Sequence, residues 1–136
     1  MCTAFYVGES MEEAERTIRP AINAYYEFLG GSRPAGEWTK AGYLDIGEKM
    51  TAEDEADDWF DFLNKRGIIV VGSVDYVVER FEQSRESIGL DHLVLMQQYT
   101  GVPYSKILAS WDRLCEHVVP RFGTQSIAQL RETAHA

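Results

Sequence analysis

The stretch RGIIVVGSVDYVVERF, residues 66–81, restricts the fold of this chain more than any other segment. Its apolar run at 68–71 contains no polar residue, which is typical of a parallel strand covered on both faces. Gly72 and Ser73 follow, and apolar residues then recur at helical spacing, so Ser73 is predicted to cap a helix. The stretch is therefore one strand-helix unit. Its Gly-Ser turn suits either a phosphate-binding turn or an ordinary helix cap.

Apolar patterns on both sides of this unit predict further strands and helices in alternation. The predicted elements are a strand at 3–7, a helix at 11–29, a strand at 68–71, a helix at 74–88, a strand at 91–96 and a helix that stops at Pro120. Such alternation indicates β-α-β units and a parallel sheet. A sheet of three parallel strands leaves two open edges, so we expect a piece of something larger or an obligate assembly.

The segment 30–67 is predicted to be a long ordered loop that contains a second helix from Thr51 onward. Six acidic residues lie between Glu53 and Asp61. A charge run of this kind usually faces solvent, so a solvated helix face is favoured over a metal site. Long loops in compact domains are usually lids or binding loops. Trp38 and Tyr43 are candidates to line an apolar pocket, although packing against the adjacent helix is the favoured role.

Composition excludes several classes of partner. The chain has 136 residues, a formal net charge of −9 and a pI near 4.7, which argues against binding to nucleic acid or to anionic lipid. No apolar run approaches the roughly 20 residues that span a bilayer, and the N-terminus lacks a signal-peptide pattern, so we expect a cytoplasmic protein. Cys2, Cys115 and the three histidines have no metal-ligand spacing, and no metal is expected.

Motifs along most of the chain, from Phe5 to Phe122, resemble the C-terminal region of the bacterial luciferase-like flavin-dependent monooxygenases. The family has a Gly-Ser/Thr-Pro-Glu-like turn, a Gly-x-x-His/Tyr strand start, a Gly-x-Pro loop and a Val-x-Pro helix end, in this order. The matching segments here are 72–75, 89–92, 101–103 and 118–120, with a further match at 7–14. Val74 departs from the family pattern, which often has proline at this first helical position.

The resemblance implies a partial (β/α)8 barrel, with residues 1–122 as about three β-α units that correspond to strands six to eight. In this interpretation 30–67 is a lid-like insertion and 123–136 is a tail. A barrel needs about 250 residues, so the missing N-terminal half, or a homodimer partner, would have to complete it. The family relationship implies reduced FMN, or a deazaflavin, used with O2 on a small organic substrate. A flavin reductase is a further implied partner.

The candidate site residues follow from this comparison with the family. Gly72 and Ser73 are candidates to contact the flavin phosphate, because barrel enzymes often hold phosphates at their last two loops. Gln97, Gln98 and Tyr99 follow the last predicted strand, where rim residues point at substrate or flavin. Trp38 and Tyr43 are the lid candidates, and no catalytic residue is identified.

Two other interpretations remain open at the level of sequence. The chain is alternatively a non-catalytic truncated homologue that dimerises through its sheet edges and binds a small ligand or serves a structural role. Met1, which lies directly before a strand, is what a short reading frame would show. A different phosphate-binding barrel family is a minor third interpretation, and it predicts binding of phosphorylated substrates without flavin.

Overall fold

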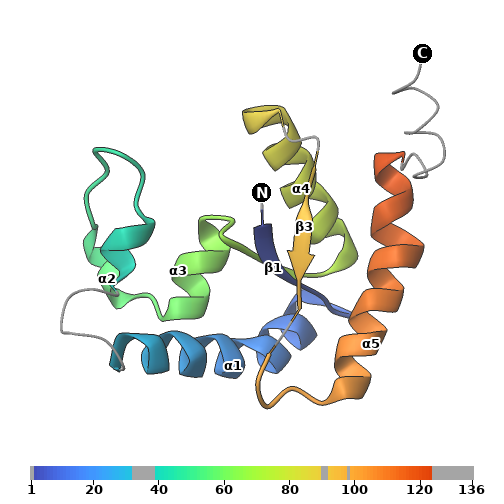
Figure 1. The fold of residues 1–136 in the computed structure, drawn as a ribbon, viewed down its shortest axis with the longest axis horizontal. Helices are drawn as coiled ribbons and strands as arrows, with labels where there is room; N and C mark the ends of the chain where they lie inside the picture. Colours follow the sequence, from blue (N-terminus) through green and yellow to red (C-terminus); the bar gives the residue numbers. More distant parts are fainter. Residues whose placement is uncertain (1, 32–38, 90–91, 98, 124–136) are drawn as a thin grey trace.

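The computed structural model describes residues 2–31, 39–89, 92–97 and 99–123, which form a three-stranded parallel sheet with helices on both faces (Figure 1). The strands are β1 (Cys2–Val7), β2 (Ile69–Gly72) and β3 (Val94–Met96). The α-helices are α1 (Met11–Gly31), α2 (Ala52–Ala56), α3 (Trp59–Lys65), α4 (Val74–Ile88) and α5 (Tyr104–Arg113). Three shorter turns are η1 (Lys40–Tyr43), the π-helical η2 (Leu114–Val118) and η3 (Val119–Phe122). The prediction of a parallel α/β fold is thereby confirmed.

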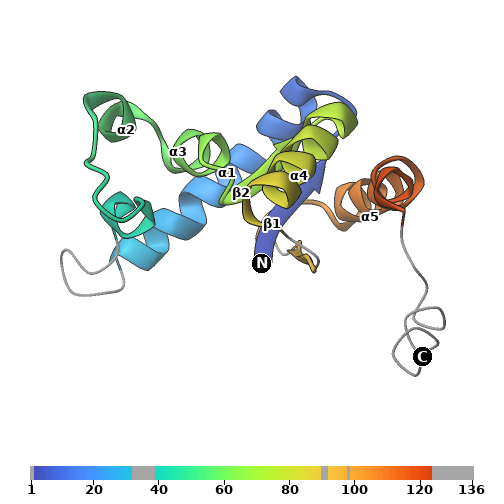
Figure 2. The same ribbon diagram turned by 90° about the horizontal axis from the view of Figure 1, so that it is seen from above.

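The side chains of β1 alternate between two apolar cores, as expected of a strand covered on both faces. Tyr6 belongs to the core that α1 and α3 complete, together with Ile18, Phe60 and Val71. The second core contains Phe5, Val7, Val77 and Leu114, from β1, α4 and η2. In Figure 2, α1 and α3 lie apart from α5, with the strands between them. Two cores on opposite sides of one sheet make this a doubly wound arrangement.

The strand order is β2-β1-β3, with β1 in the centre. β1 pairs with β2 from Ala4↔Ile69 to Val7↔Gly72, and with β3 from Cys2↔Val94 to Ala4↔Met96. Consecutive barrel strands are neighbours in chain order, so strands six to eight would have given the order β1-β2-β3. The observed order differs because the chain returns past β1 after α4. The sheet is a small parallel α/β sheet, and a barrel is not shown.

The outer edge of β2 is paired by a side chain. Asn64 of α3, which is 7% exposed, donates from Nδ2 to the Val71 carbonyl at 3.1 Å and accepts from the Val71 N–H at 3.0 Å. Its carboxamide thus makes the two hydrogen bonds that a neighbouring strand would make. By contrast, Val94 and Met96 of β3 are 58% and 53% exposed. Within the described residues no further strand pairs with either edge.

The unit that follows β2 has the predicted local chemistry. Ser73 caps α4 by accepting from the Tyr76 N–H at 3.4 Å, and Gly89 ends the helix in the left-handed conformation with φ 61°. The second helix, predicted as one element from Thr51 onward, is instead two short helices. Asp58 interrupts it because its carboxylate caps α3, accepting from the Asp61 N–H at 2.8 Å.

The backbone hydrogen-bond pattern after α5 changes from α-helical to π-helical before Pro120. The Val119 N–H donates to the Leu114 carbonyl, an i to i+5 bond, and the following turn η3 contains Pro120 near its start. Proline has no N–H to donate, so an α-helical ladder cannot continue unchanged through it. No helix among the described residues is long and apolar enough to cross a bilayer.

Candidate functional site

The carboxyl ends of β1 and β3 separate from one another. Pairing between these strands stops at Ala4↔Met96, whereas pairing between β1 and β2 continues to Val7↔Gly72. The chain runs from β1 to one neighbour and later to the other, so the sheet's topological switch point lies between β1 and β3. Open α/β sheets bind their ligands outside the carboxyl ends of the strands at such a point. This edge is therefore the first place to look for a site.

Polar side chains from three parts of the chain converge at this edge. Lys106, Ser110 and Arg113 are spaced i, i+4 and i+7 and lie on one side of α5. They meet two carboxylates that follow β1 and one carboxamide that follows β3. We call this group the carboxyl-edge cluster, and its members are Glu9, Glu13, Gln97, Lys106, Ser110 and Arg113.

Glu13 is the most buried charge of the cluster, at 6% exposure. Its Oε1 accepts from Lys106 Nζ at 2.8 Å, from the Thr17 hydroxyl at 2.9 Å and from the Tyr6 hydroxyl at 3.3 Å. Its Oε2 accepts from the Glu9 N–H at 3.3 Å. Burial acts to raise the pKa of Glu13, but the hydrogen bonds from Lys106 and Thr17 outweigh it, and the pKa lies below its usual range. Glu13 is therefore an ionised carboxylate that ties α1 to α5.

The last residue of β1 is bonded to α5 through both of its backbone groups. The Val7 N–H donates to Ser110 Oγ at 2.8 Å, and the Val7 carbonyl accepts from Arg113 at 3.3 Å. Arg113 also pairs with Glu9 at 2.8 Å. These side chains occupy the hydrogen-bonding positions that a longer β3 would have filled. With two carboxylates and two cations, the cluster carries no net charge.

Gln97 is the one predicted site residue that belongs to the cluster. Its Nε2 donates to Ser110 Oγ at 2.7 Å. Its Oε1 is buried and has no hydrogen-bond partner in the part of the chain that the structure describes. Most buried polar atoms are paired, so this unpaired acceptor is an exception within the cluster.

Tyr99 lies beside the same gap between strands. Its hydroxyl donates to the Phe5 carbonyl at 2.9 Å, and its ring packs against the core under α1. Burial raises the pKa of Tyr99, so the phenol stays protonated and keeps its role as a donor. Gln98, the third predicted rim residue, lies outside the described residues.

The Gly72-Ser73 turn is covered by neighbouring side chains. The Ser73 N–H donates to Met11 Sδ at 3.3 Å, and its hydroxyl caps α4. A Cβ added at Gly72 would lie 2.4 Å from the Tyr76 ring and 2.6 Å from Met11 Sδ. The turn therefore serves as an ordinary helix cap, and flavin-phosphate contact there stays a prediction.

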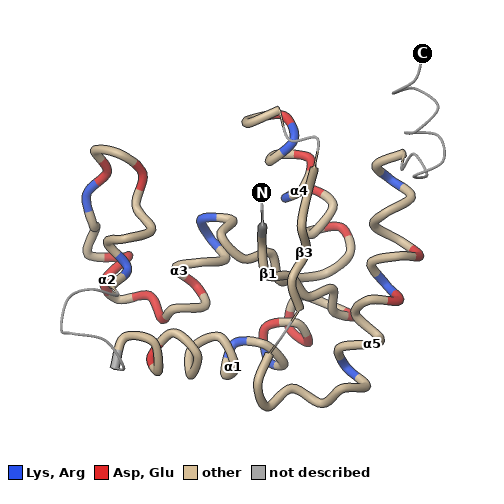
Figure 3. Tube along the Cα trace, viewed as in Figure 1, with Lys and Arg blue, Asp and Glu red and all other residues tan. Residues whose placement is uncertain are grey.

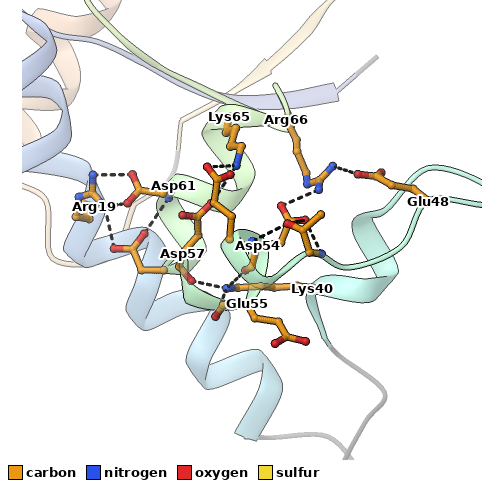
Figure 4. A network of polar contacts seen from close by, with 12 residues as sticks. Arg19, Lys40, Glu48, Asp54, Glu55, Asp57, Asp61, Lys65 and Arg66 are labelled. Atoms are coloured by element: carbon orange, nitrogen blue, oxygen red, sulfur yellow. Dashed lines mark hydrogen bonds and ion pairs between the residues drawn. The ribbon is translucent and has the colours of Figure 1, made fainter.

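The segment before β2 holds a second set of charges, which we call the insertion network (Figure 4). Arg19 of α1 bonds to Asp58 at 2.9 Å and to Asp61 at 2.6 Å. The other ion pairs and cation-carbonyl bonds of the insertion network lie within the segment before β2. Figure 3 shows the mixture of acidic and basic positions there. They are Arg66–Glu48, Arg66–Asp54, Lys65–Glu53, Lys65–Asp57 and Lys40 with the carbonyls of Asp54, Glu55 and Asp57.

Part of the acidic run is thus structural. Asp54 is 2% exposed, and hydrogen bonds from the Thr51 hydroxyl and N–H, followed by Arg66, lower its pKa to about 2. A cleft of about 520 Å³ lies beside Ile68 at the amino end of β2 and is lined mainly by these charges. Arg66 Nε is buried there without a hydrogen-bond partner among the described residues, but both terminal nitrogens of that side chain are paired with carboxylates. The charged side chains that line the cleft therefore already pair with one another.

Tyr43 takes part in aromatic packing. Its ring centroid lies 5.9 Å from that of Tyr26 and 6.1 Å from that of Trp59. Trp59 in turn stacks on Tyr26 at 5.0 Å, so the three rings join the insertion to α1. Trp38, the other lid candidate, lies outside the described residues.

Sequence reasoning missed most of the carboxyl-edge cluster. Glu13 was not singled out as a site residue, and its N–H donates to Ser10 Oγ at 3.1 Å in the first turn of α1. A usable signal was the polar i, i+4, i+7 series Lys106, Ser110 and Arg113 beside the apolar stripe of the last helix.

Among residues 2–31, 39–89, 92–97 and 99–123, no three His, Cys, Asp or Glu side chains are grouped to hold a metal ion. Comparisons with protein-family models, curated proteins and solved structures gave no match to this chain.

Proposed function

We propose that this chain forms part of a luciferase-like monooxygenase that uses reduced FMN and O2 on a small organic substrate. The observation that carries the proposal is the gap between the carboxyl ends of β1 and β3, beside which the buried amide oxygen of Gln97 has no partner among the described residues. Ligands of parallel α/β sheets bind at such gaps, and the motif order from Phe5 to Phe122 resembles this family.

The residues at this edge fit a flavin in their donor and acceptor types. The isoalloxazine ring carries N–H and carbonyl groups along one edge, which suit a carboxamide acceptor and cationic donors such as Lys106 and Arg113. When bound, the reduced flavin supplies the activation of O2. The chain's own residues would orient the ring through Gln97, hold Lys106 in place through Glu13, and exclude water with the Tyr99 ring. A deazaflavin has the same edge and is an alternative cofactor.

A barrel would require this sheet to change its pairing. For strands six to eight of a barrel, β3 would have to leave β1 and join the outer edge of β2, where Asn64 bonds to Val71, and the gap between β1 and β3 would be lost. Strands of the missing N-terminal half would then occupy the side of β1 that β3 vacates. A flavin reductase would deliver the reduced FMN. The candidate site between β1 and β3 therefore belongs to the order β2-β1-β3 and not to a barrel order.

The test is flavin binding by the chain itself. The purified protein would be titrated with FMN and, under nitrogen, with dithionite-reduced FMN, and heat release and flavin absorbance would be recorded. We expect saturable binding of the reduced form with one site per chain. Absence of binding in both states, by a chain whose circular dichroism shows a folded α/β protein, would contradict the proposal.

A second candidate is a non-catalytic dimer that binds a small ligand. The observation that favours it is the difference between the sheet edges, since Asn64 pairs the edge of β2 whereas Val94 and Met96 of β3 are more than half exposed. Light scattering on a size-exclusion column separates the two candidates. A stable, colourless dimer that ignores FMN would favour the second, and a flavin-binding chain would favour the first.

A further inference from the structure

The sulfur of Met11 joins two turns at the carboxyl edge of the sheet. Met11 is the first residue of α1, and Ser73 directly precedes α4. The Ser73 N–H donates to Met11 Sδ at 3.3 Å, a contact between residues 62 positions apart in sequence. Beside it, the Gly8 N–H donates to the Gly72 carbonyl at 2.8 Å. The turn after β1 and the turn after β2 are therefore linked by one backbone hydrogen bond and one hydrogen bond to a thioether.

The thioether lies close against the second turn. A Cβ added at Gly72 would lie 2.6 Å from Met11 Sδ, so the sulfur can approach the backbone here because residue 72 is glycine. The ring of Tyr76 closes the same space, at 2.4 Å from that added Cβ. No room is thus left between the sulfur and the turn for a further atom. Met11 as a whole is partly exposed, so it lies within reach of small molecules in solution.

We propose that Met11 is a modification site at which hydrogen peroxide forms a methionine sulfoxide, and that this modification releases the Gly72-Ser73 turn from the start of α1. The sulfur donates an electron pair to one peroxide oxygen, and the S–O bond forms as the O–O bond breaks. The departing hydroxide takes the proton of the transferred oxygen and leaves as water. Sulfur is oxidised by two electrons, and peroxide is reduced by two. The inference goes beyond the proposed function and involves no flavin.

The contact between Met11 and Ser73 cannot persist in either configuration of the sulfoxide. An oxygen that points toward Ser73 would have to fit between the sulfur and a nitrogen 3.3 Å away, so the side chain must withdraw. An oxygen that points away leaves a positively polarised sulfur facing the N–H, and that sulfur no longer accepts a hydrogen bond. The sulfoxide is also more polar than the thioether, which favours its hydration outside the turn. The Gly8–Gly72 hydrogen bond does not involve the sulfur and should remain.

Amide hydrogen exchange of Ser73 tests the release. Exchange would be followed by NMR on the whole chain before and after mild peroxide treatment, and peptide mass spectrometry would identify the methionines that gain one oxygen. We expect oxidation of Met11 to speed exchange of the Ser73 N–H about tenfold, the equivalent of one lost hydrogen bond, with unchanged far-UV circular dichroism. Treatment with methionine sulfoxide reductases should restore the original rate, because the sulfoxide is reversible.

Two variants assign the effect to one sulfur. Met11→Leu keeps an apolar side chain of similar volume but has no sulfur to accept or to be oxidised. Its Ser73 N–H should exchange at the faster rate with and without peroxide. Met96→Leu is the matched control, because Met96 lies on β3 and is 53% exposed. Its replacement removes an accessible methionine and should leave the tenfold response at Ser73 intact.

The outcomes are separable. Peroxide that oxidises Met96 while Met11 stays reduced would overturn the modification site. Oxidation of Met11 with exchange unchanged, or slowed because the sulfoxide oxygen accepts from Ser73, would overturn the release. A peroxide response that persists in Met11→Leu would assign the effect to another residue and would also overturn the proposal. None of these measurements involves flavin, so failure of the proposed function would leave this inference standing.

Discussion

The two outer strands of the sheet, β2 and β3, differ in burial and in how their outer edges are hydrogen-bonded. All four residues of β2 are buried, and Asn64 bonds to both backbone groups of Val71 on its outer side. On β3, Val94 and Met96 are more than half exposed, although Leu95 packs against the second core. The chain therefore replaces the missing neighbour of β2 with a side chain and leaves β3 without one in the described residues. An additional strand would meet less resistance at β3 than at β2.

Removal of the carboxamide that pairs β2 should destabilise the protein more than any other single substitution considered below. Asn64→Leu fills a similar volume but leaves the Val71 N–H and carbonyl buried without partners. Each unpaired group costs about 1–3 kcal/mol, so we expect the free energy of unfolding to fall by about 3 kcal/mol. Urea denaturation followed by circular dichroism would measure it.

Asn23→Leu is the control for this substitution. Asn23 is also an asparagine that accepts from a backbone N–H, that of Phe60 at 2.9 Å, but it is partly exposed. We expect a smaller loss, of about 1 kcal/mol. Equal losses for the two variants would mean that Asn64 does not have the strand-like role assigned to it.

The gap between β1 and β3 can be tested through the charge that lies beside it. Glu13→Gln removes the carboxylate that Lys106, Thr17 and Tyr6 share, while Lys106, at 42% side-chain exposure, stays hydrated. We expect a loss of about 1–2 kcal/mol at pH 7, measured by urea denaturation. Glu12→Gln is the control, because Glu12 and its partner Arg16 are 88% and 68% exposed, and it should change stability by less than about 0.5 kcal/mol.

The effect of Glu13→Gln should depend on pH. The pKa of Glu13 is lowered in the folded state, so its contribution is complete above the unfolded value of about 4.3 and disappears as pH falls through the folded value. The difference in unfolding free energy between the native chain and the variant should therefore shrink below about pH 4. A difference that stays constant from pH 7 to pH 3 would show that the charge of Glu13 is not what stabilises the edge.

The smallest effect is expected on β3 itself, and a matched pair of substitutions measures it. Val94→Thr replaces an exposed methyl group and should change the unfolding free energy by less than about 0.5 kcal/mol. Val70→Thr on β2, where the side chain is 1% exposed, buries a hydroxyl and should cost about 2 kcal/mol. Similar losses for the two would mean that β3 is covered in solution, as the dimer candidate requires.

Local signals in the sequence predicted the elements well, because each depends on near neighbours. The Ser73 cap, the Gly89 terminator and the apolar run of β2 all lie within one turn or strand of the feature they determine. The split between α2 and α3 was missed, since Asp58 looked like one more member of an acidic run although it caps a new helix.

Long-range features could not be predicted in the same way. The position of β3 beside β1 depends on which strand edge is free, and Asn64 gives no sequence signal that it pairs with Val71. In the candidate site, Gln97 and Tyr99 were predicted because they follow a strand. Glu13 and Ser110 were missed because their partners are 93 and 103 residues away in sequence.

Ionisation of the buried hydroxyl of Tyr99 can be followed by absorbance, which gives a signal from the segment after β3. Burial raises the pKa of Tyr99 and, with help from Glu13, raises that of Tyr6 to about 12, so both phenols absorb as neutral species while the fold persists. Ordinary tyrosines ionise near pH 10, and the stability contributed by these two declines as pH rises above about 10. An alkaline absorbance titration at 295 nm, about the phenolate maximum, would thus show delayed phenolate formation. A ligand that moves Tyr99 away from the Phe5 carbonyl would expose the phenol and lower the pH at which it ionises. Ligand binding could then be detected by absorbance without a label.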